Sequence, residues 1–272
     1  MNQYVSFLLL PFISCLTLVG ILSYFGMHVI KRGIIFVDLS LAQVAALGMT
    51  LSILLGNELD DTITYFLSLG FALVGAALFT YTRGIKSEIP QEAIIGIVYA
   101  VSTAAAIIMV SHSPEGAEHI QHLLVGSILT VTAGALLKAS GIFAVIGLFH
   151  FVKRARFLEL SFNQNADKKY SKFWEFLFYA SFAVAVTSAV KICGVLMVFV
   201  FLVVPSVYAA LVTNKSVMHR LLHGWLFGIV GSAAGLVLSF QLDTPTGATI
   251  VCTLGLMLLL YGGYRIAIAT TA

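Results

Sequence analysis

Two polar side chains interrupt a long apolar stretch near the start of the chain, and both are of a type that can bind a cation. Asp38 and Gln43 lie within the apolar run Ile34–Leu55. Carboxylate and amide oxygens are donors that suit hard divalent ions, and polar groups within a membrane helix usually have a functional role. If the run is helical, Asp38 lies about 6 Å from its start and Gln43 about 13 Å, close to the middle of a hydrocarbon core about 30 Å thick.

Each of these residues also has a structural interpretation, and the sequence leaves both open. Asp38 could pair with Lys31 or Arg32 near the inner end of the run, and Gln43 could form a hydrogen bond between helices. Five residues of separation rotate the two side chains by about 140° around a regular helix. A pathway lined by Gln43 would therefore have Asp38 at its inner end, and the two would not share one ion.

Two further candidates fall between apolar runs. Asp243 begins the segment Asp-Thr-Pro-Thr-Gly. Its carboxylate could be an entry ligand or an outer-gate contact, or it could cap a turn or helix by accepting from backbone amides. His119 and His122 are three residues apart, a spacing that places two imidazoles on one face of a helix, where they can share a transition metal.

The composition that surrounds these residues is that of an integral membrane protein. Of the 272 residues, 60% are apolar and 10% are charged, against roughly 25% charged in soluble domains. Eight or nine crossings of about 20 residues each leave only short loops, and no G-x-x-x-x-G-K-[ST] phosphate loop is present. Any ATP chemistry must therefore come from another chain. The net charge of +3 is too small to indicate nucleic-acid binding.

Hydropathy predicts an all-α membrane protein, a polytopic bundle of eight or nine transmembrane helices that forms one domain over residues 1–272. The candidate spans are Tyr4–Phe25, Ile34–Leu55, Thr62–Tyr81, Ala93–Val110, Ala139–Val152, Phe173–Val190, Gly194–Thr213, Gly224–Phe240 and Gly247–Ala269. The run Leu123–Val131 is too short to span a bilayer. We interpret it as a short interfacial or re-entrant helix.

The basic residues orient these spans, because Lys and Arg accumulate on the cytoplasmic side. Nine spans with the N-terminus outside leave only Lys138 and Lys191 outside. The other thirteen basic residues lie inside: Lys31, Arg32, Arg83, Lys86, Lys153, Arg154, Arg156, Lys168, Lys169, Lys172, Lys215, Arg220 and Arg265. The outer loops then collect acids and histidines, a distribution that would attract a cation to the outer mouth. These residues are Glu58, Asp60, Asp61, His112, Glu115, Glu118, His119, His122 and Asp243.

The longest inner loop, Lys153–Lys172, combines apolar and charged side chains. Phe157, Leu160 and Phe162 stand among arginines and acids, a pattern typical of a surface that docks on another protein. The alternative is a polar membrane-surface loop that is basic because of its topology alone.

Five segments, in order along the chain, resemble the permease subunits of zinc, manganese and iron ABC importers. They are Gly33–Gly48, Pro90–Ala100, His119–Leu129, Gly194–Pro205 and Asp243–Gly247. The resemblance covers nearly the whole chain. It implies an ABC importer permease in the bacterial inner membrane that works as a homodimer, with separate ABC ATPase subunits and an extracytoplasmic metal-binding protein. It implies no permanently bound cofactor, because the divalent metal ion is cargo.

The resemblance also bears on single residues. It makes the inner loop with Phe157, Leu160 and Phe162 the place where the permease meets its ATPase, and it includes His119 in a family-like motif. The zinc and manganese branch usually carries a His in the second span, four residues after an Asp. Counting back from Gly48 puts Gln43 where that His would be, with Asp38 one position out of register.

An amide oxygen is a harder and weaker donor than imidazole, so Gln43 suits Mn or Fe at least as well as Zn. The sequence therefore predicts a non-enzymatic permease subunit of an ATP-driven importer of a divalent transition-metal ion. Its metal pathway is predicted to include Gln43, Asp38, Asp243 and His119. An ATP-independent secondary transporter or channel for a metal cation is the alternative. A membrane metalloprotease is not indicated, because the sequence has no H-E-x-x-H motif.

Overall fold

The computed structural model describes residues 2–59, 61–83, 89–111, 126, 128–162 and 168–271. The described residues form helices joined by turns, with no strand among them. The elements are α1 (Asn2–Arg32), α2 (Val37–Leu54), α3 (Thr62–Arg83), α4 (Gln91–Val110), the 3₁₀ turn η1 (Ile128–Thr130), α6 (Ala133–Val152), α7 (Arg154–Phe162), α8 (Lys168–Val212), α9 (Val217–Leu242) and α10 (Thr246–Thr271). Within this part of the chain, eight helices are long and apolar enough to cross a membrane. The predicted all-helical membrane bundle is confirmed.

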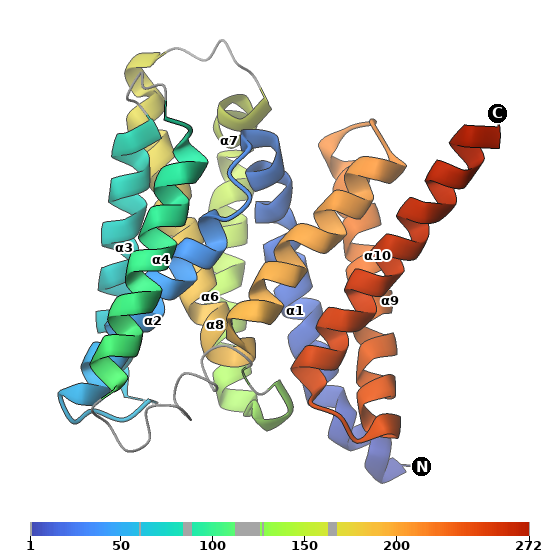
Figure 1. The fold of residues 1–272 in the computed structure, drawn as a ribbon, viewed down its shortest axis with the longest axis horizontal. Helices are drawn as coiled ribbons and strands as arrows, with labels where there is room; N and C mark the ends of the chain where they lie inside the picture. Colours follow the sequence, from blue (N-terminus) through green and yellow to red (C-terminus); the bar gives the residue numbers. More distant parts are fainter. Residues whose placement is uncertain are drawn as a thin grey trace.

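The longest helix, α8, consists of two arms that meet at Gly194. This residue has φ 77° and ψ 167° within a helical assignment of 45 residues, a backbone conformation that glycine adopts most readily. The arms run in opposite directions (Figure 1). Contacts with α1 agree with this path: the Phe25 ring centroid lies 5.6 Å from that of Phe178 in the first arm, and the Ser23 hydroxyl donates to the Phe201 carbonyl in the second arm at 3.3 Å. The predicted spans Phe173–Val190 and Gly194–Thr213 are these two arms.

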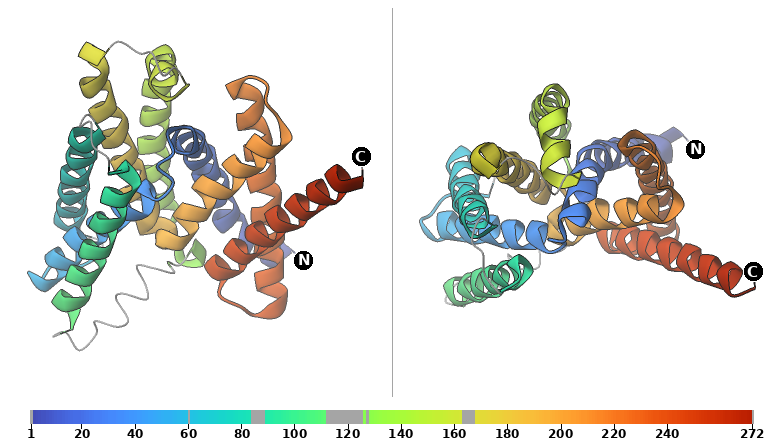
Figure 2. Two further views of the ribbon diagram at one scale, coloured as in Figure 1. Left: turned by 45° about the horizontal axis from the view of Figure 1, so that its top comes forward. Right: turned by 90° about the horizontal axis from the view of Figure 1, so that it is seen from above.

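The chain begins at one end of the bundle and finishes at the other (Figures 1 and 2). This matches an odd number of crossings, as the nine-span prediction requires. We call the end with α7 and the C-terminal ends of α1 and α3 the inner end, and the opposite end the outer end. The described basic residues predicted to be cytoplasmic belong to inner-end segments, whereas Lys191 lies beside the α8 turn at the outer end.

One predicted boundary differs from the structure for an identifiable reason. The fifth span begins at Ala133 and not at Ala139, because the Thr132 side chain caps the helix by accepting from the Ala135 backbone N–H. This cap starts the helix before Lys138, the charged residue that directly precedes the predicted span. The predicted short helix Leu123–Val131 lies partly outside the described residues, and its described part contains η1 with Ile128 buried.

Helix α2 lies at the centre of one half of the bundle and has the largest buried share of the eight candidate spans. It packs against α3, α4 and α8. On the α3 side the helices are joined by polar contacts between small residues: Ser68 donates to the Ala45 carbonyl at 2.8 Å, and the Ser52 and Thr64 hydroxyls are 2.9 Å apart. Small and hydroxylated side chains let membrane helices approach closely, so α2 is held tightly along this side.

The second arm of α8 approaches α1 even more closely. A Cβ atom at Gly26 would overlap the Leu202 carbonyl oxygen and the Ser206 hydroxyl. The Ser206 hydroxyl donates to the Ser23 carbonyl at 3.0 Å. The absence of a side chain at Gly26 is therefore what allows these two helices to touch.

We predict that Glu58→Cys and Lys191→Cys, in a background without Cys15, Cys193 and Cys252, react in intact cells with a membrane-impermeant maleimide. Lys215→Cys should react only after permeabilisation, because the second arm of α8 returns the chain to the inner end. Lys153→Cys is the matched inner control. Labelling of Lys215→Cys in intact cells would contradict the two-armed α8.

A second prediction concerns the α1–α8 contact. Gly26→Ala should destabilise the protein by about 2 kcal/mol, because an added methyl in a packed core forces displacement of its neighbours. Gly20→Ala on the same helix is the control, since nothing lies within 4 Å of its Cβ position. The midpoint of thermal unfolding in detergent measures both, and equal midpoints would show that α1 and α8 are further apart than described.

Candidate ion-pathway residues and the inner polar cluster

A turn between α1 and α2 places Asp38 inside the protein. Gly33 has φ 65° and ends α1, with its N–H bonded to the Ile30 carbonyl and the Ile34 N–H bonded to the Val29 carbonyl. This pattern is the Schellman motif, which favours glycine in the left-handed position. Helix α2 then begins at Val37, below the inner end of α1 in Figure 1.

Asp38 lies in the first turn of α2 and is 1% exposed. Neither of its carboxylate oxygens has a hydrogen-bond partner among the described residues. The alternative ion pairs with Lys31 or Arg32 are absent: Arg32 pairs with Glu175 at 3.0 Å, and the Lys31 ammonium lies 5.8 Å from the Phe162 ring centroid. Asp38 is therefore a buried carboxyl group for which the described residues supply no cation.

Gln43 is 5% exposed and lies about one and a half turns further along one continuous helix. Ala45 and Ser52 mark the side of α2 that faces α3. At about 100° per residue Gln43 lies on the opposite side. The rotation expected between Asp38 and Gln43 is therefore retained, and the two face different surroundings.

The other two predicted pathway residues lie elsewhere. Asp243 is exposed and ends α9 in the left-handed conformation, with φ 50° and ψ 48°, which Asp tolerates better than most residues. The adjoining turn is closed by hydroxyl contacts, including Ser239 with Thr246 at 2.7 Å. His119 lies outside the described residues. The structure therefore does not bring Asp243 together with Asp38 or Gln43.

The predicted docking residues turn toward the bundle. The Lys153–Lys172 segment contains the short helix α7, on which Phe157 is fully buried and stacks on His150 with ring centroids 4.0 Å apart. Leu160 packs against the core, and Phe162 lies 5.9 Å from the His28 ring. An amphipathic helix buries its apolar side, and here the protein's own bundle covers that side. The Phe157 ring is therefore not presented to another chain in this conformation.

A buried ion-pair cluster at the inner end was not predicted from the sequence. Glu175 accepts from Arg32 at 3.0 Å and from Arg83 at 3.2 Å, with side chains 8%, 0% and 25% exposed respectively. Tyr179 receives hydrogen bonds from Arg83 at 3.3 Å and from Gln91 at 3.2 Å. The cluster thus joins α1, α3, α4 and α8. Glu175 lies within a predicted apolar span, and an acid there is the sequence signal that could have indicated it.

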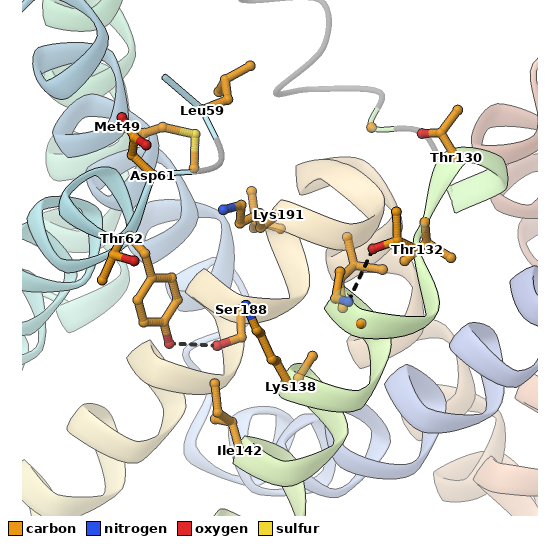
Figure 3. A pocket seen from close by; sticks show the side chains of 18 of the residues that line it. Met49, Leu59, Asp61, Thr62, Thr130, Thr132, Lys138, Ile142, Ser188 and Lys191 are labelled. Atoms are coloured by element: carbon orange, nitrogen blue, oxygen red, sulfur yellow. Dashed lines mark hydrogen bonds between the residues drawn. The ribbon is translucent and has the colours of Figure 1, made fainter. Parts of the chain in front are cut away.

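A cavity of about 760 Å³ opens near the outer end, between α3, α6 and the α8 turn. Figure 3 shows Lys138, Lys191, Asp61 and Ser188 around it. Tyr65 and Ser188 bond across part of the cavity at 3.0 Å. Two lysines with one carboxylate are not the donor set of a metal site, and the described residues contain no group of three or more His, Cys, Asp or Glu side chains that could hold a metal. The cavity is therefore not assigned to the ion.

The fold and these buried polar groups define a multi-pass membrane permease. The model of the ABC 3 transport family matches residues 5–262, and the chain belongs to this family.

Curated relatives of the chain include metal-transport membrane proteins. It is 26% identical over 257 residues to the manganese transport system membrane protein MntC of Listeria monocytogenes, covering 92% of this chain and 87% of the relative. It is 24% identical over 238 residues to the manganese import system permease protein ScaB of Streptococcus gordonii, covering 86% and 82%.

Two solved structures share the fold. PsaBC from Streptococcus pneumoniae, in complex with Fab, aligns with a TM-score of 0.77 at 23% identity, over 93% of this chain and 90% of that chain. An inward-facing conformation of a putative metal-chelate type ABC transporter aligns with a TM-score of 0.72 at 20% identity, over 97% and 88%.

The inner cluster leads to a stability prediction. Glu175→Gln should destabilise the protein by about 3 kcal/mol, because removing one partner leaves buried guanidinium charge uncompensated. Glu159→Gln is the control: its pair with Arg156 at 3.4 Å is largely exposed, and such pairs contribute at most about 1 kcal/mol. Thermal unfolding in detergent measures the two variants, and a Glu175→Gln midpoint no lower than that of Glu159→Gln would disprove the structural role.

Proposed function

We propose that this chain is the membrane-spanning subunit of an ATP-driven importer of a divalent transition-metal ion. The observation that supports this most is Asp38, a buried carboxylate with no hydrogen-bond partner among the described residues, on the most buried of the described candidate spans of a chain from this family. An unpaired buried charge is costly, and a passing cation would offset that cost. Gln43, deeper in the same helix, would supply an amide oxygen at a separate point along the path.

The donor chemistry favours manganese or iron over zinc as cargo. Asp38 and Gln43 both offer oxygen, and oxygen donors suit Mn, whereas imidazole and thiolate suit Zn. The manganese-related names of MntC and ScaB are consistent with this preference. Asp243, exposed at the outer end, would raise the local cation concentration at the entrance more than it would coordinate the ion.

The proposed assembly is a homodimer of this chain with two separate ATPase subunits and an extracytoplasmic metal-binding protein. The ATPase would dock at the inner end, where α7 lies. Since Phe157 is buried, the contact would be made by the outward side of α7, where Arg154 and Arg156 are exposed. This side is basic and would fit an acidic surface.

Uptake of radioactive Mn and Zn at matched membrane expression tests the pathway. Gln43→Leu should abolish uptake of both metals, because a leucine supplies no donor to a dehydrating ion. Gln43→His should retain transport and shift preference toward Zn, because imidazole is the softer donor. Asp38→Asn should lower uptake at least tenfold, whereas Asp243→Asn should lower it mainly at low external metal.

Gln241→Leu, the same substitution at an exposed outer position, is the matched control and should transport normally. Normal uptake by both Gln43→Leu and Asp38→Asn would reject this pathway. Uptake that persists in cells lacking the ATPase would instead support an ATP-independent transporter.

A further inference from the structure

Helix α7 contacts the bundle through aromatic rings and through one hydroxyl group. Phe157 stacks on His150 of α6, and Phe162 lies beside His28 of α1. Near the end of α7, the Ser161 hydroxyl contacts two side chains of α1: His28 Nδ1 at 2.7 Å and Arg32 Nε at 2.8 Å. A single hydroxyl group thus forms two hydrogen bonds between α7 and α1.

The direction of one of these bonds follows from the chemistry of the groups. A guanidinium can only donate, so Ser161 Oγ accepts from Arg32 Nε. A hydroxyl oxygen has two lone pairs, so Ser161 Oγ either donates to His28 Nδ1 or accepts a second hydrogen bond from it, according to the His28 tautomer. His28 Nε2 is buried and has no hydrogen-bond partner among the described residues.

Arg32 Nη2 is also buried without a hydrogen-bond partner among the described residues. These two nitrogens lie one helical turn apart on α1, beside α7. Leaving a buried polar nitrogen unpaired is costly, and such groups in native structures need an explanation. A second arrangement of α7 and α1, in which both nitrogens find partners, would explain them.

Arg32 links the contact between Ser161 and α1 to helices α8 and α3. Its guanidinium carbon lies 3.8 Å from the Phe178 ring centroid on α8, and its Nη1 donates to Glu175, which also holds Arg83 of α3. A shift of Ser161 relative to α1 therefore alters the geometry of the group that joins α1, α3 and α8.

We propose that Ser161 is the positioning residue through which movement of α7 on the ATPase reaches the Arg32–Glu175–Arg83 cluster and so couples ATP hydrolysis to metal transport. This inference rests on the proposed function, in which α7 is the ATPase contact. Ser161 itself touches neither ATP nor metal. Its role is to set how many ATP molecules are hydrolysed for each metal ion transported.

The test uses the complete transporter with its ATPase and metal-binding protein, reconstituted in proteoliposomes with Mn²⁺. Ser161→Ala should leave ATP hydrolysis within about twofold of wild type and lower Mn²⁺ uptake at least tenfold, so that the ATP consumed per ion rises at least fivefold. Ser161→Thr, which keeps the hydroxyl, should restore the wild-type ratio.

Ser14→Ala is the matched control, because among the described residues the buried Ser14 hydroxyl bonds only to the Leu10 carbonyl of its own helix. If Ser161→Ala does not fold, Ser161→Cys replaces it, with an intermediate ratio expected from the weaker hydrogen bonds of a thiol. An unchanged ratio in the folded variant, or hydrolysis and uptake that fall in parallel, would overturn the coupling role. Wild-type Mn²⁺ uptake by proteoliposomes that lack the ATPase would reject the proposed function itself. This result is distinct from the two results that would overturn only the coupling role of Ser161.

Discussion

The carboxylate of Glu175, held between two guanidinium groups in an apolar surrounding, is the interaction on which the arrangement of the helices depends. Burying any one of these three charges without its partners would be costly, because it would be uncompensated. Arg32 and Glu175 are 143 positions apart in the chain, so they meet only when α1 and α8 are already side by side. Arg83 and Gln91 then add α3 and α4 to the same point, so four helices are joined at the inner end.

Asp38 forms an instructive contrast with Glu175. Both are buried acids in candidate spans, but Glu175 has two cationic partners while Asp38 has none among the described residues. A carboxylate that is already neutralised has little to offer a passing ion, whereas one that has only a helix terminus beside it retains most of its attraction. Under the proposed function, the difference between the structural acid Glu175 and the pathway acid Asp38 is therefore one of partners and not of burial.

The sequence was sufficient for features that depend on local composition. Spans and direction followed from apolar runs and from the distribution of Lys and Arg, and the α8 turn fell where Gly194 begins a new run. It was insufficient where the outcome depends on a distant partner. The apolar residues of the inner loop could equally cover an ATPase or the bundle. Phe157 is buried because rings from α6 and α8, including His150 and Trp174, surround it. The link between Ser161 and α1 likewise joins residues 133 positions apart, and no local pattern marks it.

The two arms of α8 also bear on how the chain enters the membrane during synthesis. Between the predicted spans Phe173–Val190 and Gly194–Thr213 only Lys191, Ile192 and Cys193 remain, which is too short a connection for the arms to insert one after the other. They must enter as a preformed hairpin that carries the Lys191 ammonium across the hydrocarbon layer with it. The insertion machinery therefore has to hold both apolar arms at once, and a substitution that stiffens Gly194 would affect biogenesis before it affected the finished transporter.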